Sequence, residues 1–551
     1  MEEGGRRKNI HSFTHSLIHS FTHSKFNHSI IAPATRSVIQ NMRRIFIYAT
    51  ALAVLVSASS CDSGFEDVNK NPVLATSVDP IYLFSNSQFT SAIATQNYQM
   101  QIVQQINTPY TGVLEGGNHN AVSDPNSNAN FNSLYLQNGP VNLLTTVIAQ
   151  TKDNPARSNL YNMSRIWKAY VFMVLVDTYG DVPYFEAGKA FLEGINLPKY
   201  DDQKVIYDDI LKELQEGTKA LDASKAIESG DLFFKGNIAQ WKKLGNSLLL
   251  RAAMRYSKID VAKAKQYVTI AVDPANGGLQ SSNADNALIA FNSTFNHPLA
   301  NYFQGTERGN VYLGKALVDF LKETNDPRIR VIAVKYETPG NPLATAGAEN
   351  TTPADQEGMP YGYNESTIAN APGFPGKIGS AFKYSQINRR TLGKIDAPEF
   401  FITYSQTSLL LAEAVQRGWT TGDVKALYEA GVKAHMNQMA TYDVLATIPT
   451  ASQDAFLTAN PFVPAKALEQ INNQYWVSSF LNGSEAWANF RRSGFPVLPV
   501  NNYPGKDPSV KDFIKRLVYP VLERSVNEAN YKAAVARMGP DELGTPLFWD
   551  K

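Results

Sequence analysis

Apolar side chains recur at helical spacing along most of the chain beyond residue 80, and this pattern restricts the possible folds more than any other feature. Between residues 237 and 258, Trp241, Leu244, Leu248 and Ala252 stand at i, i+3, i+7 and i+11. Basic residues occupy the other faces, so this helix has one apolar face that must pack against a neighbour. Similar helices are predicted at residues 81–106, 131–150, 159–178, 205–221 and 313–323.

Two segments predict helices that pack in pairs. Trp241, Leu244, Gly245 and Leu248 match the W-x2-L-G-x2-Y opening of a tetratricopeptide helix pair, with leucine in place of the tyrosine. Residues 400–417 predict a further helix, which Gly418 ends, and Asp423 caps a second helix that extends to about residue 439. The connection is short, so these two helices should be antiparallel.

The chain changes character between residues 326 and 396, where proline and glycine become frequent. Tyr361, Tyr363 and Phe374 are interleaved with them. A long irregular insertion of this kind in a compact protein is usually functional or mobile. Residues 448–464 and 496–508 are two further loop-rich stretches. The sequence therefore predicts a helical scaffold that presents long loops.

The first 79 residues are predicted to be a leader, a signal peptide and a tether that precede the folded domain. Met42 is followed by Arg43 and Arg44, an apolar run and then small residues before Cys61, which is the only cysteine. The apolar run is shorter than the about 20 residues that a membrane-spanning helix needs, so residues 42–60 are predicted to be a lipoprotein signal peptide with lipidation at Cys61. Residues 1–41 are a His-rich leader, interpreted as a mis-started or disordered segment, although a metal-binding tract is an alternative. Residues 61–79 are predicted to be a tether, and 80–551 a single domain.

Composition excludes several classes of function. Lysine and arginine number 51 against 50 acidic residues, so the chain lacks the basic excess of a nucleic-acid-binding protein. One cysteine cannot form a disulfide scaffold or a cysteine-based zinc site. Beyond the leader only His119, His297 and His435 remain, far apart in sequence, which disfavours histidine-paired nucleophiles and polyhistidine metal sites.

Several segments together carry a resemblance to a known family. Residues 177–184 read DTYGDVPY, residues 325–328 read NDPR, and residues 485–496 read EAWANFRRSGFP. The helix at 241–255, the segment 516–523 and the terminal Phe548, Trp549 and Asp550 follow in the same order. In this combination the chain resembles the SusD/RagB nutrient-binding outer-membrane lipoproteins of Bacteroidetes over residues 61–551.

The resemblance implies a mostly α-helical protein with about four tetratricopeptide-like helix pairs, whose long loops form the ligand face. It also implies a lipid-anchored protein on the outer membrane that faces outward from the cell. Such a protein captures an oligosaccharide or a peptide and delivers it to a SusC/RagA-type TonB-dependent transporter. No cofactor and no catalytic or metal-binding residue are implied.

The charged residues of these motifs have structural interpretations that compete with catalytic ones. Asp177 and Asp181 could be paired catalytic carboxylates, but we expect them to cap and hydrogen-bond a tight turn. Gly180 permits a positive φ just beyond a helix end. Glu485, Arg491 and Arg492 could hold an acidic ligand, whereas an ion-pair network inside the scaffold is the favoured interpretation.

Ligand contacts are expected on aromatic and amide side chains of the loops, because aromatic rings can cover the apolar faces of sugars. The resemblance places these contacts after the first helices and after the third helix pair. The candidates are Tyr110, Asn118, His119, Phe295, Tyr302, Phe303, Tyr361 and Tyr363, with Tyr302 and Tyr361 ranked first.

Two other functions remain open at this level. A surface-anchored glycosidase needs two carboxylates roughly 5 to 10 Å apart, and the sequence neither establishes nor excludes such a pair. A helical adaptor would bind only protein through grooves between helix pairs. The chain contains no HExxH, GxSxG or phosphate-loop pattern.

Overall fold

The computed structural model describes residues 78–550 except for 94–95, 112–113, 115–116 and 341–348. The chain divides into two compact units, Met1–Ser77 and Val78–Lys551, and the described residues belong to the second. The predicted leader, the signal peptide, Cys61 and nearly all of the tether lie outside the described residues. None of the described helices is both long and apolar enough to span a bilayer.

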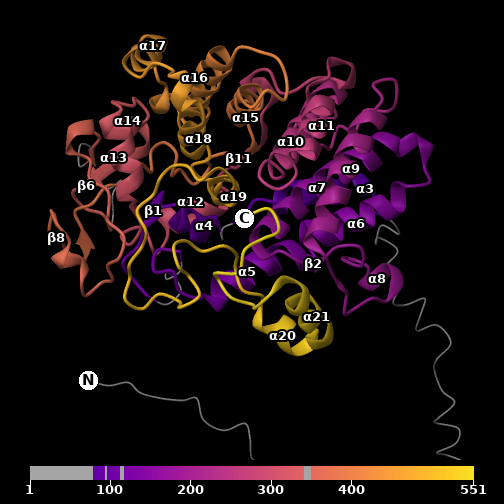
Figure 1. Ribbon diagram of the computed structural model, residues 1–551, viewed down its shortest axis with the longest axis horizontal. Helices are drawn as coiled ribbons and strands as arrows, with labels where there is room; N and C mark the ends of the chain where they lie inside the picture. The colour runs from indigo at the N-terminus through magenta and orange to yellow at the C-terminus, as the bar shows by residue number, and fades with distance from the viewer. Residues whose placement is uncertain (1–77, 94–95, 112–113, 115–116, 341–348, 551) are drawn as a thin grey trace, which may run out of the picture. The chain divides into compact units, whose positions relative to one another are not determined.

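Four helix pairs form the scaffold of the second unit (Figure 1). The pairs are α7 (Ser158–Tyr179) with α9 (Gln203–Ala220), α10 (Ile238–Met254) with α11 (Val261–Val272), α15 (Tyr404–Gln416) with α16 (Val424–Tyr442), and α18 (Ala467–Ser478) with α19 (Gly483–Ser493). Helix α10 also packs on α9 and α15, and α15 packs on α18. The pairs are therefore joined in one continuous helical scaffold, which confirms the predicted fold class.

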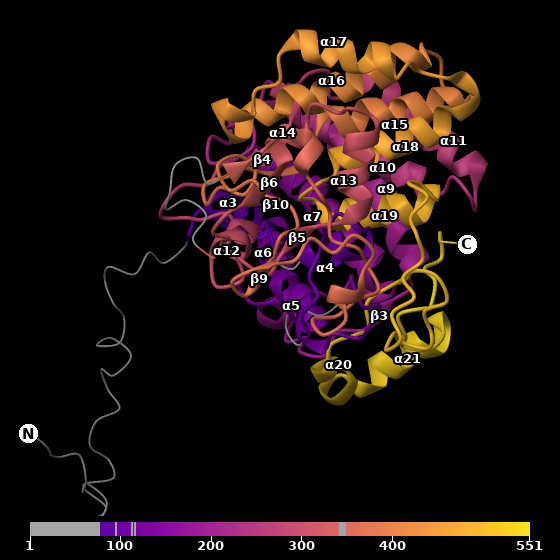
Figure 2. The ribbon, with the colours of Figure 1, turned by 90° about the vertical axis from the view of Figure 1, so that its left-hand side faces the viewer.

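Further helices pack around these pairs. Helices α3 and α6 lie beside α7, and α4 packs on α19. In Figure 2 the C-terminal helices α20 and α21 lie at the opposite end of this unit from α16 and α17. The bounds are α3 (Pro80–Thr90), α4 (Gln96–Ile102), α5 (Asp124–Tyr135), α6 (Pro140–Thr151), α8 (Ala190–Glu193), α12 (Pro298–Gln304), α13 (Lys315–Glu323), α14 (Ile329–Ile332), α17 (Thr450–Ala459), α20 (Val521–Val526) and α21 (Glu528–Met538).

The described strands are short and pair antiparallel in small sheets that join distant loops. Most of them fall in the loop-rich insertion at 326–396 or pair with segments close to it. The sheets are β1 (Ile106–Asn107) with β5 (Tyr312–Leu313), β6 (Ala333–Tyr336) between β10 (Gln386–Ile387) and β7 (Glu349–Asn350), β11 (Glu399–Ile402) with β4 (Ala287–Ile289), β2 (Val182–Pro183) with β3 (Tyr200–Asp201), and β8 (Lys377–Ile378) with β9 (Ala381–Phe382).

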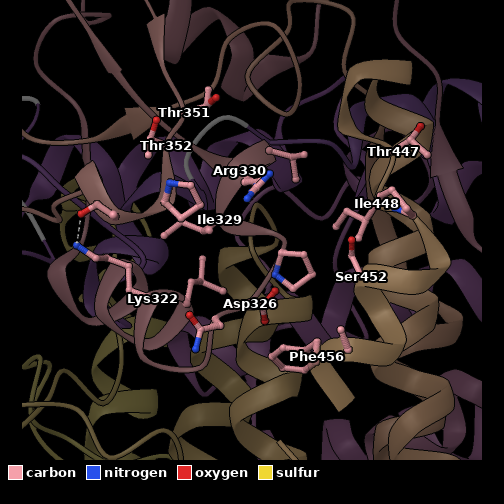
Figure 3. Close-up of a pocket in the computed structure, with 18 of the residues that line it drawn as sticks. Lys322, Asp326, Ile329, Arg330, Thr351, Thr352, Thr447, Ile448, Ser452 and Phe456 are labelled. Carbon is pink, nitrogen blue, oxygen red and sulfur yellow. Dashed lines mark hydrogen bonds between the residues drawn. The ribbon is translucent and has the colours of Figure 1, made fainter. Parts of the chain in front are cut away.

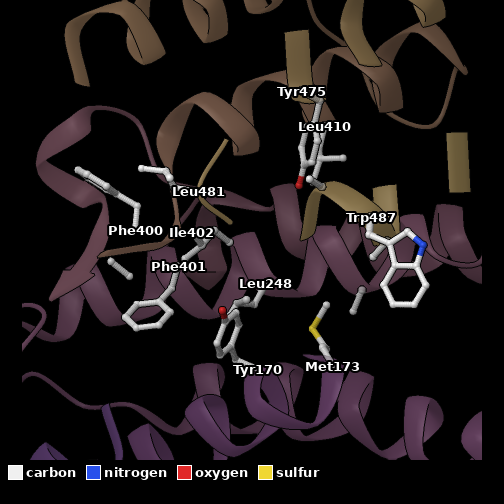
Figure 4. Close-up of a cluster of buried hydrophobic side chains, with 14 of the residues drawn as sticks. Tyr170, Met173, Leu248, Phe400, Phe401, Ile402, Leu410, Tyr475, Leu481 and Trp487 are labelled. Carbon is white, nitrogen blue, oxygen red and sulfur yellow. The ribbon is translucent and has the colours of Figure 1, made fainter. Parts of the chain in front are cut away.

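The main core lies where the helix pairs meet. Figure 4 shows Tyr170 of α7 and Leu248 of α10 near each other, with Trp487 of α19 to one side of them and the β11 residues Phe400 and Phe401 to the other. All five side chains are at least nine-tenths buried. Burial of such side chains stabilises a fold by about 1.5 to 3 kcal/mol each, so the contacts made where the pairs meet help to hold the scaffold together.

Several helix ends differ from those predicted. The helix predicted at 131–150 is divided into α5 and α6, because Gly139 and Pro140 start a new helix. The helix predicted at 400–417 begins only at Tyr404, since β11 pairs with β4 and Thr403 then forms a capping box with Gln406. The helix predicted at 81–106 is likewise divided into α3 and α4.

Other helix ends are as predicted. Asp423 caps α16 by accepting a hydrogen bond from the Ala426 backbone N–H at 3.1 Å. Gly418 follows α15 with a φ of 71°, in the left-handed region that glycine tolerates. Short polar residues and glycines therefore set these boundaries locally.

Candidate functional site

A buried ion-pair network connects three of the helix pairs. Arg255, the residue directly after α10, places Nε 3.2 Å from Asp177 Oδ2 on α7 and Nη2 2.8 Å from Glu485 Oε2 on α19. Arg251 Nη1 lies 3.6 Å from the same Glu485 oxygen. Burial alone would raise the pKa of Glu485, but Arg251 and Arg255 outweigh it and lower that pKa. The predicted interpretation as a scaffold ion pair is confirmed for Glu485, whose partners Arg251 and Arg255 were not predicted.

A second buried ion pair holds α15 against α19. Arg492 Nη1 and Nη2 donate to the two carboxylate oxygens of Glu413 at 2.7 and 2.6 Å. Arg417 and Asn472 donate to the same carboxylate. Despite burial, which acts in the opposite direction, Arg492 and then Arg417 lower the pKa of Glu413 to about 2. Glu413 and Arg492 are therefore buried inside the scaffold.

The segment 177–184 forms a tight turn at the end of α7. Gly180 has a φ of 85°, and a Cβ there would lie 2.5 Å from Met538 Sδ. Asp181 accepts a hydrogen bond from the Gln203 backbone N–H at 2.9 Å and pairs with Arg537 Nη2 at 2.7 Å. Asp177 and Asp181 are at least nine-tenths buried. The Asp177 carboxylate accepts from the Tyr207 hydroxyl and pairs with Arg255, so it joins helices and does not cap the turn, and the prediction is wrong for Asp177.

Five of the predicted ligand residues lie together with two from the C-terminal loop. We name this set the loop cluster: Tyr110, Asn118, His119, Tyr361, Tyr363, Asn501 and Tyr503. The His119 ring stacks on Tyr503 with centroids 4.2 Å apart, and His119 Nε2 lies 3.1 Å from the Tyr363 carbonyl oxygen. Asn501 Nδ2 donates to the Asn118 carbonyl. Three loops far apart in sequence therefore meet here.

Asn118 and His119 form the inner part of the loop cluster. Both are essentially fully buried, and Asn118 Nδ2 donates to the Thr108 carbonyl. Tyr361 is anchored in a similar way, since its hydroxyl donates to the Gln101 carbonyl at 2.7 Å and also contacts the Ile106 carbonyl. Burial raises the pKa of Tyr361 well above its ordinary value. These three side chains hold their loops in place from the protein interior.

Tyr110, Tyr363 and Tyr503 form the accessible part of the loop cluster. Each is only partly buried, as Tyr361 is, but the Tyr361 hydroxyl is directed inward to the Gln101 and Ile106 carbonyls. Tyr110 and Tyr363 pack on a small hydrophobic core that is separate from the main one and consists of Tyr312, Met359, Ile368, Ala371, Phe382 and Tyr384. Asn364 Nδ2 donates to the Tyr503 hydroxyl at 3.2 Å. Amphipathic rings supported in this way can offer a face and a hydroxyl to a ligand.

Phe295, Tyr302 and Phe303 form a second group on α12 and the loop before it. Phe295 is 59% exposed and makes an edge contact with Phe89 at 5.9 Å. Phe303 is buried, and its ring lies 5.7 Å from that of Tyr302. Burial raises the pKa of Tyr302 to about 12. Of these three residues, Phe295 has the most exposed ring.

Asn501 and Tyr503 were not among the residues predicted from sequence. The only signal was the loop-rich character of residues 496–508. Asn501 is buried and also accepts from the Tyr503 backbone N–H at 3.1 Å. Their position beside His119 depends on how the C-terminal loop returns to the first helices, which one sequence does not reveal.

Comparison with known proteins identifies the family. A profile of the SusD-like family described as starch-binding and associating with the outer membrane matches residues 72–520. The chain belongs to this family. SusD-like proteins bind nutrients at the outer membrane and are typically non-catalytic, so this chain is a SusD-like nutrient-binding protein associated with the outer membrane.

Solved structures agree with the family assignment. A chitin-binding protein is 30% identical, with a TM-score of 0.74 over 86% of this chain and 100% of its own. A SusD-like protein from Bacteroidetes AC2a is 26% identical, with the same TM-score and coverage. A SusD homologue from Bacteroides uniformis, 21% identical with a TM-score of 0.70, shares the fold. No curated protein sequence matches the chain.

Proposed function

We propose that the chain is a cell-surface lipoprotein that captures an oligosaccharide or a peptide and delivers it to a SusC/RagA-type TonB-dependent transporter. The family match over residues 72–520 carries this proposal. Lipidation at Cys61 would attach the protein to the outer membrane, with the helical domain facing outward. The loop cluster, together with Phe295 and Tyr302, would form the ligand face.

The ligand class that we favour is an oligosaccharide. The partly buried rings of Tyr110, Tyr363 and Tyr503 suit the apolar faces of sugars, and the Asn364 amide beside them suits hydroxyl groups. The 30% identical relative is a chitin-binding protein, so a chito-oligosaccharide is the first ligand to test. The family description names starch, which makes a malto-oligosaccharide the second.

Calorimetric titration with chitohexaose and maltohexaose tests the ligand face. We expect one of them to bind, and Tyr110→Ala with Tyr363→Ala to weaken binding at least tenfold. Tyr82→Ala is the matched control, because Tyr82 is 67% exposed on α3 and lies outside the loop cluster. Equal affinity in the double variant and the control would remove these two tyrosines from the site.

Tyr302 and Tyr361, ranked first from sequence, need a separate variant. The Tyr361 hydroxyl anchors its loop, so the double replacement by alanine is compared with replacement by phenylalanine. We expect the alanine variant to lose affinity and the phenylalanine variant to keep the stacking faces. Unaltered affinity in the alanine variant, at an unchanged melting temperature, would exclude both residues from ligand contact.

Product analysis separates this function from its alternatives. Chromatography of the glycan after incubation should return it intact, while turnover would support the surface glycosidase. Asp177, Asp181 and Glu485, the carboxylates of the motifs at 177–184 and 485–496, are engaged in ion pairs, which argues against that alternative. Copurification of the full-length chain with a TonB-dependent transporter from outer membranes tests the partner.

A further inference from the structure

A large cavity lies away from the loop cluster, between the loop-rich insertion and the α16–α17 region. Its volume is about 950 Å³, and none of the loop-cluster residues lines it. The walls come from α13 and α14, from residues 351–354, and from η7 (Val444–Ala446) with α17. Figure 3 shows Arg330 in this cavity, with Thr351 and Thr352 to one side and Ile448 and Ser452 to the other. A volume near 1,000 Å³ is at the upper end of the range for small-ligand sites.

One side of the cavity is apolar and mainly aliphatic. Ile448 and Phe456 are buried at its base, and Leu445 is 67% exposed at its edge. The opposite wall adds Leu321, Ile329 and Val331. The one aromatic ring among the lining residues, Phe456, is 3% exposed, so it offers no open face on which a sugar could stack. An aliphatic group fits this lining better than a sugar ring.

The charged residues that line the cavity carry a net positive charge. Asp326 is the one carboxylate in the lining, and it is already paired with buried Arg328, whose Nε donates to Asp326 Oδ1 at 2.9 Å. Lys322 Nζ donates to the Ala354 and Gln356 carbonyls at 3.0 and 2.7 Å, which leaves its charge without an acidic partner. The cavity therefore presents uncompensated positive charge beside an aliphatic wall.

Arg330 is the cation that a ligand could engage. Within the described part of the chain its guanidinium makes no hydrogen bond and no ion pair, and the side chain is exposed. Asn325, Thr351 and Ser452, which also line the cavity, have no hydrogen bond through their side chains among the described residues. A guanidinium binds a carboxylate through two parallel hydrogen bonds. Donors for such a group are thus available next to the apolar wall.

We propose that this cavity binds a carboxylate that carries an aliphatic group. The carboxylate pairs with Arg330, and the aliphatic part lies against Leu445, Pro449 and Ala455, which are exposed apolar residues of the lining. A free aliphatic acid and the C-terminus of a short apolar peptide share this chemistry. The site is separate from the loop cluster, so it stands independently of the glycan-binding proposal.

Calorimetric titration of the purified full-length protein with two carboxylates and their neutral amides tests this site. The probes are octanoate with octanamide, and N-acetyl-Leu-Leu with its C-terminal amide. We expect at least one carboxylate to bind at least tenfold more tightly than its amide, with an affinity that falls as salt is raised. Binding of octanoate alone identifies an aliphatic acid, and binding of the peptide alone identifies a peptide C-terminus.

Three variants locate the binding. Arg330→Gln should weaken carboxylate binding at least tenfold, while Lys225→Gln, which removes a positive charge from an exposed loop elsewhere, should leave it unchanged. Ala455→Trp fills the cavity from the exposed side of α17 and should abolish binding of both forms. Circular dichroism melting verifies that each variant folds. The proposal is overturned if neither carboxylate binds, if the amides bind equally well, or if Arg330→Gln binds like the wild type.

Discussion

The ion pair between Glu413 and Arg492 offers a quantitative test of how the helix pairs are held together. Both side chains are fully buried, and two hydrogen bonds of 2.7 and 2.6 Å join them across α15 and α19. Replacement of Glu413 by glutamine keeps the size of the side chain but removes the carboxylate charge. The Arg492 guanidinium then remains buried without its counter-charge.

The magnitude follows from the pKa of Glu413, which is lowered to about 2 from 4.5. At about 1.4 kcal/mol per pKa unit, the carboxylate form is stabilised by about 3 kcal/mol in the folded state. Removing one partner of a buried ion pair typically costs about 3 to 5 kcal/mol. Both routes lead to an expected loss of about 3 to 5 kcal/mol in the free energy of unfolding at pH 7.

Urea unfolding followed by tryptophan fluorescence measures this loss. Glu429→Gln is the matched control, because Glu429 lies on the surface of α16 with Lys425 at 3.8 Å, and exposed pairs contribute about 1 kcal/mol or less. If Glu413→Gln loses less than 1 kcal/mol, or no more than the control, the pair does not hold α15 against α19 and the reasoning is wrong.

Three further predictions concern pH, backbone conformation and the anchor. Because the pKa of Glu413 is lowered in the folded state, the contribution of its carboxylate to the free energy of unfolding is complete above pH 4.5 and is lost as the pH falls toward about 2. In that pH range, the free energy of unfolding of the wild type should therefore fall more steeply than that of Glu413→Gln. Gly180→Ala should lower the free energy of unfolding by about 1 to 3 kcal/mol, because Gly180 has a positive φ and lies close to the Met538 sulfur. The control Gly194→Ala should lower it less, because Gly194 has a φ of 72° but open space around it. Equal losses in urea unfolding would discount the Met538 contact. Cys61→Ala should move the protein from the membrane fraction to the soluble fraction, and mass spectrometry of the wild type should find an acylated N-terminus at Cys61; a mature chain that retains residues 11–28 would contradict this.

The helical scaffold could be predicted from sequence because its signals are local. Helix α10 shows its apolar spacing around Trp241, and helix α16 begins directly after the capping residue Asp423. Gly180 has the positive φ that its place after a helix predicted, and Gly418, which was predicted to end a helix, also has a positive φ. Apolar spacing, capping residues and glycines all lie within a few residues of the helix or helix end that they determine.

The strands and the loop cluster could not be predicted because they depend on distant partners. Phe400, Phe401 and Ile402 are buried on both faces of β11, and such a short apolar run does not distinguish a strand from a helix. Its pairing with β4 decides the question. In the same way, Tyr503 stacks on His119 across 384 positions of sequence (503 minus 119), and no local pattern predicts that contact.

The predicted ligand residues show that sequence also cannot tell which aromatic side chains of a loop are exposed. Residue type and loop position identified Tyr110 and Tyr363, which are partly exposed, together with His119 and Phe303, which are buried. Sequence cannot separate a ring that faces a ligand from one that supports the loop, because burial depends on neighbours contributed by other loops. The ligand face therefore stays a prediction that binding experiments must test.

Hydrogen–deuterium exchange of the intact protein with and without chitohexaose tests the central claim most directly. If the loop cluster is the ligand face, the glycan should slow amide exchange in the described parts of residues 104–120, 359–384 and 496–508, with little change in the helix pair α10–α11. Exchange that slows only in the helix pairs, or nowhere at concentrations that saturate binding, would contradict the account.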